Sequence, residues 1–261
     1  MSLSVTLDGK TFDVNSLQWR NDSAPMRYTS VKDAISDLPA DCSDVQYKTE
    51  PNSHFQRMMR YDEDEGFPKK VTHHEVRKLS VIIKKRLELI PVKKHGADWR
   101  DLPNVVIQLE DGRMTQKIKY PYIDHKFRKP AVCSCAKGPK AKCTVMDRQE
   151  LTLIPWALAH TANSHNHWSG LYSRVHWHSY FSTVVTNVHP DGKQGRVIHP
   201  EENRLLSVRE CARAQGFPDS AKFCGSIVEQ YRQIGNAVPP PLGKALGNAI
   251  LCAQDDSDII H

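Results

Sequence analysis

Three cysteines and one histidine in the middle of the chain have the residue types and the spacing of a metal site. Cys133 and Cys135 are separated by one residue, Cys143 follows after seven more, and His160 after a further sixteen. Structural zinc takes four tetrahedral ligands from this set of side chains. The Cys-x-Cys pair is tighter than the usual Cys-x₂-Cys, so the spacing also fits unrelated thiols beside an unrelated histidine. Other histidines compete for the fourth position: His165, His167 and His176.

A second stretch, RQIGNAVPPPLGKALG at residues 232–247, combines a Gly-Asn pair with three prolines. Proline fixes φ and has no N–H, so we expect a stiff extended rod whose last proline opens a helix. Gly235 would permit a sharp turn, and the Asn236 amide can both donate and accept. The pattern predicts a rigid polar loop that suits a ligand with polar edges, with a simple helix entry as the alternative. An apolar stripe follows, at Leu242, Ala245, Leu246, Ala249 and Cys252.

Helices and hairpins must position these two stretches. Apolar spacing and capping residues predict four helices, at residues 31–36, 76–90, 208–215 and 226–234. The third opens with a capping box, in which Ser207 is followed three positions later by Glu210. Two Asp-Gly dipeptides predict hairpin turns at residues 8–9 and 111–112, and the β-branched and aromatic residues of 171–186 predict strands.

Positive charge is concentrated in the middle of the chain. The 261 residues carry a net charge of +6, and ten Lys/Arg face three Asp/Glu between Lys69 and Arg100. Between Arg113 and Arg148 the same count is ten against two. Such segments are typical either of a solvated surface or of one that binds a polyanion. The sequence has no run of 18 apolar residues and no secretory leader pattern, so we expect the cytosol or the nucleus.

Longer stretches resemble the DNA (cytosine-5)-methyltransferases. RQIGNAVPPPLGKALG resembles the tenth motif of that family, and SVRECARAQGFPD, which precedes it in the expected order, resembles the ninth. Four upstream stretches resemble the maintenance-type branch found in animals and related lineages: YTSVKDAISDLP, DWRDLPNVVIQLEDGRM, HNHWSGLYSRV and FSTVVTNVHPDGKQGRVIHPEE. The resemblance covers nearly the whole chain and implies a DNA substrate and a nuclear location.

The resemblance also implies an α/β fold. The chain would hold the C-terminal portion of a Rossmann-like methyltransferase domain and an irregular, β-rich, zinc-containing target-recognition domain. We expect residues 1–39 to be a residual part of the catalytic domain, 40–204 the target-recognition domain, and 205–261 the helices that return to the catalytic domain. In the family, the Gly-Asn loop lines the S-adenosylmethionine pocket, so the implied cofactor contacts are Asn236 and Val238.

Two loops that read CpG in double-stranded DNA are implied as well. In the first, Leu158, Trp168 and Leu171 would form an apolar pocket for the 5-methyl group of a hemimethylated site, although Trp168 and Leu171 also suit an ordinary core. In the second, Lys193 and Gln194 lie between glycines and would reach base edges. The family resemblance assigns Zn²⁺ to Cys133, Cys135, Cys143 and His160.

This chain departs from the family pattern at two positions in these loops. The vertebrate enzymes have a cysteine where Ala157 stands, and a methionine where Asp191 stands. A smaller methyl pocket and an acid near phosphate would both weaken discrimination, so a preference for hemimethylated sites stays open while CpG recognition is expected.

The nucleophile of the family is not found. The reactive cysteine of these enzymes follows a proline, and none of the seven cysteines here does. The Glu-Asn-Val motif and a Gly-x-Gly turn after a first strand are missing too. The resemblance therefore implies no catalytic residue in this chain, which would be inactive without the missing N-terminal part of the catalytic domain. The alternative interpretation is a non-catalytic, zinc-stapled DNA-binding module.

Overall fold

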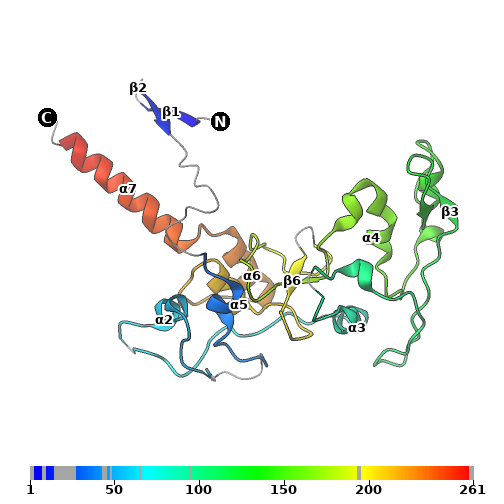
Figure 1. Ribbon diagram of the computed structural model, residues 1–261, viewed down its shortest axis with the longest axis horizontal. Helices are drawn as coiled ribbons and strands as arrows, with labels where there is room; N and C mark the ends of the chain where they lie inside the picture. Colours follow the sequence, from blue (N-terminus) through cyan, green and yellow to red (C-terminus); the bar gives the residue numbers. More distant parts are fainter. Residues whose placement is uncertain are drawn as a thin grey trace.

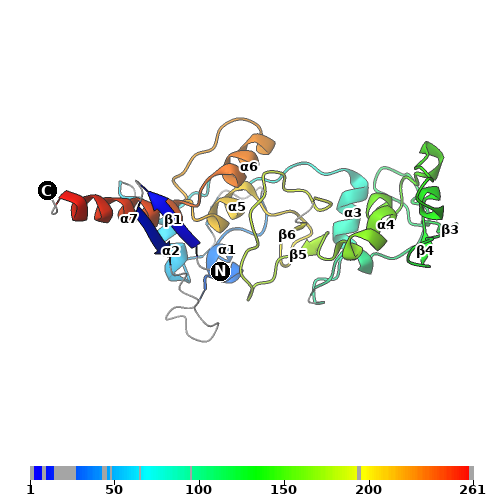
Figure 2. The same ribbon diagram turned by 90° about the horizontal axis from the view of Figure 1, so that it is seen from above.

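The computed structural model describes residues 3–7, 10–14, 28–42, 46–47, 49–64, 66–94, 96–192 and 195–258. The molecule is elongated, with the long helix α7 at one end and the lobe that contains β3 at the other (Figures 1 and 2). Seven α-helices lie in the described residues: α1 Val31–Ile35, α2 His54–Arg60, α3 Val81–Leu89, α4 Trp156–Thr161, α5 Val208–Ala214, α6 Ile227–Asn236 and α7 Pro240–Asp258.

Strands are few and short in the described residues. They form three two-stranded sheets: β1 Leu3–Leu7 with β2 Lys10–Val14, β3 Tyr122–Ile123 with β4 Pro130–Ala131, and β5 Ser173–Arg174 with β6 Arg196–Ile198. The first two sheets are antiparallel and the third is parallel. The antiparallel β1–β2 pair confirms the first predicted hairpin, although its turn residues lie outside the described residues. The mixture of helices and small sheets agrees with an α/β class, but the middle of the chain is irregular rather than β-rich.

The prediction of strands over residues 171–186 is wrong beyond β5. Carbonyl groups of this segment cap a helix instead of joining a ladder, because the Ser179 and Trp177 oxygens accept hydrogen bonds from the amides of Val31 and Lys32 at the start of α1. The predicted helix at 31–36 is confirmed, and Ser30 closes a capping box with Asp33. Apolar and aromatic composition marked the segment as buried without revealing which groups its backbone would pair with.

Helix α3 begins at Val81, five residues later than predicted. Residues 73–75 are not helical, and the carbonyls of His73 and Glu75 accept hydrogen bonds from the amides of Arg209 and Val208 in the first turn of α5. The first turn of a helix has amides without intrahelical partners, so this segment satisfies two of them. The capping box at Ser207 and Glu210 is present as predicted.

Helix α5 is the centre of the core. All of its residues except the last are buried, including Arg209 and Arg213. The Arg213 guanidinium lies 2.5 Å from Asp37 and 2.6 Å from Asp219, and it also donates to the carbonyl of Ala34. This network joins α1 to α5 across the sequence. Removing one partner of such a buried pair typically costs about 3–5 kcal/mol, because the other charge stays buried without compensation.

Candidate functional site

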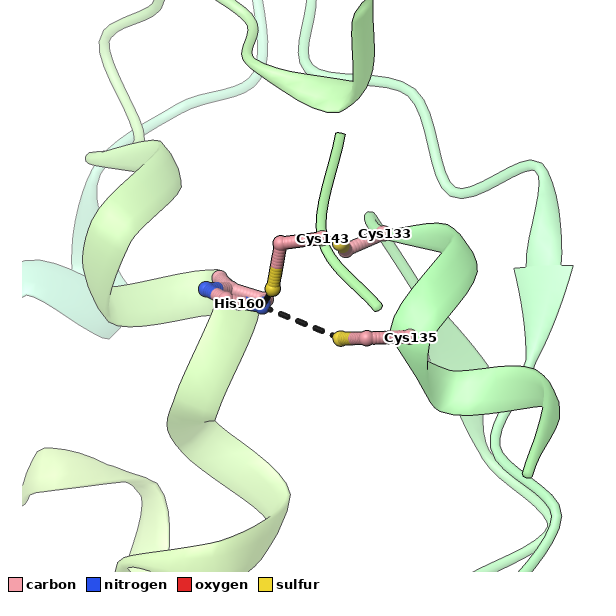
Figure 3. A group of neighbouring side chains, drawn as sticks. All are labelled: Cys133, Cys135, Cys143 and His160. Atoms are coloured by element: carbon pink, nitrogen blue, oxygen red, sulfur yellow. Dashed lines mark hydrogen bonds between the residues drawn. The ribbon is translucent and has the colours of Figure 1, made fainter. Parts of the chain in front are cut away.

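The four predicted zinc ligands come together between α4, which carries His160, and the segment at residues 133–143. Their sulfur and nitrogen atoms all lie within 4.8 Å of one another, and they point toward a common centre (Figure 3). Nε2 of His160, in the last turn of α4, lies 3.1 Å from Sγ of Cys135 and 3.2 Å from Sγ of Cys143. Tetrahedral zinc places its ligand atoms about 3.5–3.8 Å apart, so a small adjustment would admit the ion. The competing histidines at 165, 167 and 176 do not belong to this group.

The protonation states of this cluster fit a zinc site. Burial and the neighbouring thiols raise the pKa of Cys135 to about 12, and burial also raises the pKa of Cys133. Burial lowers the pKa of His160, so its imidazole is neutral and can offer a lone pair. The thiols of Cys133 and Cys135 stay protonated until a cation offsets their charge, and Zn²⁺ would replace those protons. The donor set and its geometry therefore both suit zinc.

Asp147 links the two cysteine-bearing segments. Its carboxylate accepts hydrogen bonds from the amide and hydroxyl of Ser134, at 3.1 and 2.6 Å, and from the amide and hydroxyl of Thr144, at 3.0 and 2.7 Å. Ser134 lies between Cys133 and Cys135, and Thr144 follows Cys143. These bonds lower the pKa of Asp147. No motif in the sequence indicated this role, since Asp147 is not at ligand spacing.

The first predicted recognition loop has an unusual backbone. Asn166, His167, Trp168 and Tyr172 all have φ between 47° and 55°, and Gly170 has φ 88°. Each non-glycine residue in this region costs of order 1–3 kcal/mol and persists only where surrounding contacts hold it. The side chains of Leu158 and Leu171 are buried in the core, and the half-buried Trp168 packs against the same core.

The second recognition loop lies directly on the first. The amide of Tyr172 donates to the carbonyl of Pro190, and that of Ser173 to the carbonyl of Gly195. A Cβ on Gly195 would lie only 2.5 Å from the Pro190 oxygen and 2.9 Å from Leu171, so only glycine allows this approach. Lys193 and Gln194 lie outside the described residues.

Asp191 is paired within its own loop. His189 bonds its carboxylate, and although burial opposes ionisation, this partner holds the pKa of Asp191 below its usual range. The Asp191 carboxylate, which stands where the vertebrate enzymes have a methionine, is therefore directed to an imidazole of its own loop.

The predicted cofactor residues lie at the junction of α6 and α7. Asn236 ends α6, and both Asn236 and Val238 are exposed, the latter by 61%. Gln215, just after α5, donates from its side chain to the carbonyl of Ile234 and so caps α6. A Cβ on Gly216 would lie 2.8 Å from the ring of Pro241, so the residues after α5 also contact the proline segment. The ninth- and tenth-motif stretches are therefore one structural unit.

Two details of the proline segment differ from the prediction. The prolines are not an extended rod, because α7 already begins at Pro240, and both Pro240 and Pro241 occupy its first turn where a missing N–H is tolerated. Gly235 makes no sharp turn, because it lies inside α6. It is required for a close approach instead, since a Cβ there would lie 2.5 Å from the amide nitrogen of Thr186.

Comparison with known proteins defines the family. The model of the C-5 cytosine-specific DNA methylase family matches residues 10–252. This chain belongs to that family. It is 48% identical over 262 residues to DNA (cytosine-5)-methyltransferase 1 of Mus musculus, 46% over 256 residues to that of Gallus gallus, and 46% over 265 residues to DNA (cytosine-5)-methyltransferase PliMCI of Paracentrotus lividus.

These alignments cover most of this chain and little of its relatives. The alignment includes 96% of this chain for the Mus musculus protein, 94% for that of Gallus gallus and 97% for that of Paracentrotus lividus. In each case it includes 16% of the relative's length. The methylase family is an enzyme family whose members use S-adenosylmethionine and act on DNA. Within the described residues, no helix is long and apolar enough to cross a membrane.

Proposed function

We propose that this chain is the recognition and C-terminal part of a maintenance-type DNA (cytosine-5)-methyltransferase. The whole enzyme would transfer a methyl group from S-adenosylmethionine to C5 of cytosine in CpG sites of nuclear double-stranded DNA, including hemimethylated sites. The observation that carries the proposal is the direct packing of loop 166–172 and Ser173 against Pro190 and Gly195, in a chain that also brings together a Cys₃His cluster. The family match and the names of the relatives support it.

The three regions of the chain have distinct roles in this proposal. Residues 1–39 complete the catalytic domain, 40–204 hold the DNA, and 205–261 return to the catalytic domain. Leu158, Trp168 and Leu171 would form the apolar surface near the target methyl group, and Lys193 and Gln194 would contact base edges. Basic side chains around the loops would neutralise phosphates.

Asn236 and Val238 would form one wall of the cofactor pocket. The bound S-adenosylmethionine would supply an electrophilic methyl group. What this chain contributes is position: the Gln215 cap and the Gly216–Pro241 contact hold the exposed α6–α7 junction against α5. The remaining walls would come from the part of the catalytic domain that this chain lacks.

Zinc would have a structural role. Cys133, Cys135, Cys143 and His160 would bind the ion with all four tetrahedral positions filled, which leaves none open for substrate. The second hydrophobic cluster of the chain contains only Ile118, Val132 and Cys133 as buried members. So small an apolar core would gain stability from a metal crosslink.

A methyl-transfer assay tests the catalytic part of the proposal. In this family a cysteine thiolate attacks C6 of a flipped-out cytosine, and C5 then takes the methyl group. No cysteine here has the Pro-Cys-Gln context of that nucleophile. The isolated chain should therefore transfer no label from S-adenosylmethionine to hemimethylated duplex, and turnover should appear when the upstream part of the catalytic domain is supplied. Turnover by the chain alone would refute the proposal.

DNA binding tests the recognition part and the alternative. The chain should bind CpG duplex with an affinity that falls steeply as salt rises, because phosphate contacts release counterions. If it binds DNA but gains no activity with the upstream part, it is a non-catalytic zinc-stapled DNA-binding module. A DNA affinity that does not change with salt concentration would show that the basic segments do not contact the phosphates.

A further inference from the structure

The loop at residues 166–172 keeps an unfavourable backbone that something must hold. Of the seven non-glycine residues with positive φ in the described part of the chain, four lie in this loop. Three of them, Asn166, His167 and Trp168, are consecutive. L-residues avoid this conformation, and such outliers cluster where a loop is preformed for a ligand.

Three residues far away in the sequence hold the loop almost residue by residue. The indole N–H of Trp99 donates to the carbonyls of His167 and Trp168, at 3.0 and 3.2 Å. The backbone amide of Trp99 donates to the carbonyl of Leu171 at 3.0 Å. The Asp98 carboxylate accepts the amide of Gly170 at 2.9 Å.

The holding residues are themselves fixed. Asp98 is 1% exposed and Trp99 is 6% exposed. The Asp98 carboxylate binds the Arg100 guanidinium through both oxygens, at 2.8 and 2.7 Å, and that guanidinium also reaches the Ser169 hydroxyl at 3.3 Å. A buried carboxylate with this bidentate partner has little freedom to rotate. Residues 167–170 are thus each hydrogen-bonded to the rigid segment at residues 98–100. Residues 167 and 168 bond through their carbonyls, 169 through its hydroxyl and 170 through its amide.

We propose that Asp98, Trp99 and Arg100 form a positioning clamp that preforms loop 166–172 and thereby sets the discrimination of the protein between CpG and other DNA sequences. This inference rests on the proposed DNA-recognition function. The second loop, which carries Lys193 and Gln194, rests on loop 166–172 through the bond from the Tyr172 amide to the Pro190 carbonyl. Base-edge contacts of the second loop therefore depend on exact placement of loop 166–172, whereas phosphate contacts tolerate small shifts. Loss of the clamp should therefore weaken discrimination and leave non-specific affinity in place.

The test compares two tryptophan variants of the full 261-residue chain, loaded with zinc. Trp99→Phe keeps an aromatic ring in the core and removes the N–H that binds the loop. Trp177→Phe is the matched control, because it removes an indole N–H that donates to Glu201 outside the loop, at 2.8 Å. For each protein, affinity is measured at one fixed salt concentration for a CpG duplex and for a duplex of the same composition without CpG.

We expect Trp99→Phe to lower the ratio of CpG affinity to non-CpG affinity about tenfold, because the variant loses about one hydrogen bond that holds the loop in its binding conformation. Its affinity for the non-CpG duplex should stay within about twofold of wild type, as phosphate contacts are unaffected. Trp177→Phe should keep the wild-type ratio. An unchanged ratio in Trp99→Phe would overturn the clamp alone, whereas a wild-type chain without CpG preference would contradict the proposed function and the clamp with it.

A second measurement does not depend on DNA. In Asp98→Asn, an NH₂ group replaces one of the two carboxylate oxygens. The side chain then has a donor in place of one of the acceptors available to the Gly170 amide. Hydrogen exchange at Gly170 and its loop neighbours should speed up at least about tenfold in this variant, while exchange in α5 stays at the wild-type rate. Equal acceleration throughout the molecule, or none in the loop, would overturn the assignment of Asp98 as a positioning residue.

Discussion

At the scale of single residues, carboxylates that are not metal ligands hold the segments around them in place. Asp147 touches no metal position, yet its four hydrogen bonds join the segments that bear three of the four ligands. Partners of this kind orient metal ligands and tune affinity from outside the coordination shell. Asp98 plays a comparable part beside loop 166–172, because its carboxylate accepts a hydrogen bond from the backbone amide of Gly170.

Asp147→Asn should weaken zinc binding by about 10–100-fold, the usual effect of losing such a partner. The amide replaces one accepting oxygen with a donor, so at least one bond to Ser134 or Thr144 is lost. Zinc affinity is measured by competition with a chromophoric chelator. Asp124→Asn is the control, because that carboxylate bonds Lys126 and Phe127 in its own turn and the side chain of Asn163, rather than Ser134 and Thr144. Equal affinity in both variants would show that Asp147 has no part in the site.

His199 should make the folded state sensitive to acid. Burial lowers its pKa to about 4, and its Nδ1 accepts from the amides of Glu201 and Glu202. Below the unfolded pKa of about 6.5 the unfolded chain binds a proton that the folded chain does not, so stability falls from pH 6.5 toward pH 4. The loss at pH 5 relative to pH 7.5 is about 2 kcal/mol.

The variant His199→Asn isolates this effect, because the amide oxygen can replace Nδ1 as acceptor and does not titrate. The free energy of unfolding in urea, measured at pH 7.5 and pH 5, should fall about 2 kcal/mol less in the variant than in wild type. Identical pH dependence in the two proteins would mean that His199 is protonated in the folded state.

At the scale of elements, the arrangement depends on close approaches that only glycine allows. Gly235 in α6 lies against the backbone of Val185 and Thr186, and Gly216 lies against Pro241. The first contact joins α6 to the segment between loops 166–172 and 189–192, and the second joins α7 to the residues that follow α5. Alanine normally stabilises a helix more than glycine does, but at Gly235 the neighbouring backbone of Val185 and Thr186 leaves no room for a methyl group.

Gly235→Ala should destabilise the protein by about 1–3 kcal/mol, the cost of forcing extra atoms into packed structure. Its Cβ would lie 2.5–2.7 Å from backbone atoms that cannot move independently. Gly247→Ala in α7 is the matched control, with nothing within 4 Å of its Cβ, and should gain up to about 1 kcal/mol of helix stability. The midpoint of thermal unfolding checks the first variant, and helical circular dichroism the second. A rise in midpoint for Gly235→Ala would contradict the close approach.

At the scale of the whole molecule, the two ends differ in how they are supported. The Cys₃His cluster lies toward the end that contains β3, whereas α7 projects from the body at the other end (Figure 1). Among the described residues of α7, 241–254 are exposed except for the half-buried Gly247. Leu246, Ile250 and Leu251 on that helix are 54%, 61% and 59% exposed. The stripe after the prolines, at Leu242, Ala245, Leu246, Ala249 and Cys252, is exposed as well. Under the proposed function its partner surface would belong to the rest of a catalytic domain.

The double variant Leu246→Glu/Ile250→Glu should make the isolated chain more monomeric, because an exposed apolar stripe drives self-association. Sedimentation at increasing protein concentration measures the change. The same variant should fail to restore activity with the upstream part of the catalytic domain, since it charges the face that would dock there. Lys244→Glu changes the charge of α7 at an exposed polar position and should alter neither result. If the double variant self-associates as strongly as the wild type, α7 is not the surface through which the chain associates.

The sequence by itself determined features that depend on neighbours three or four positions apart or on ligand chemistry. Ser30 and Ser207 cap helices where predicted, and the Cys₃His set assembles from residues named by type and spacing. The family, too, could be read from motif stretches.

Only the tertiary structure decided how backbone groups far apart in the sequence pair with one another. It placed the 171–186 segment as a cap for α1, put Gly235 inside a helix against Thr186, and held the left-handed loop on Asp98 and Trp99. The physical reason is that a local pattern reports which groups need a partner or a buried face, while the identity of that partner depends on how the whole chain packs.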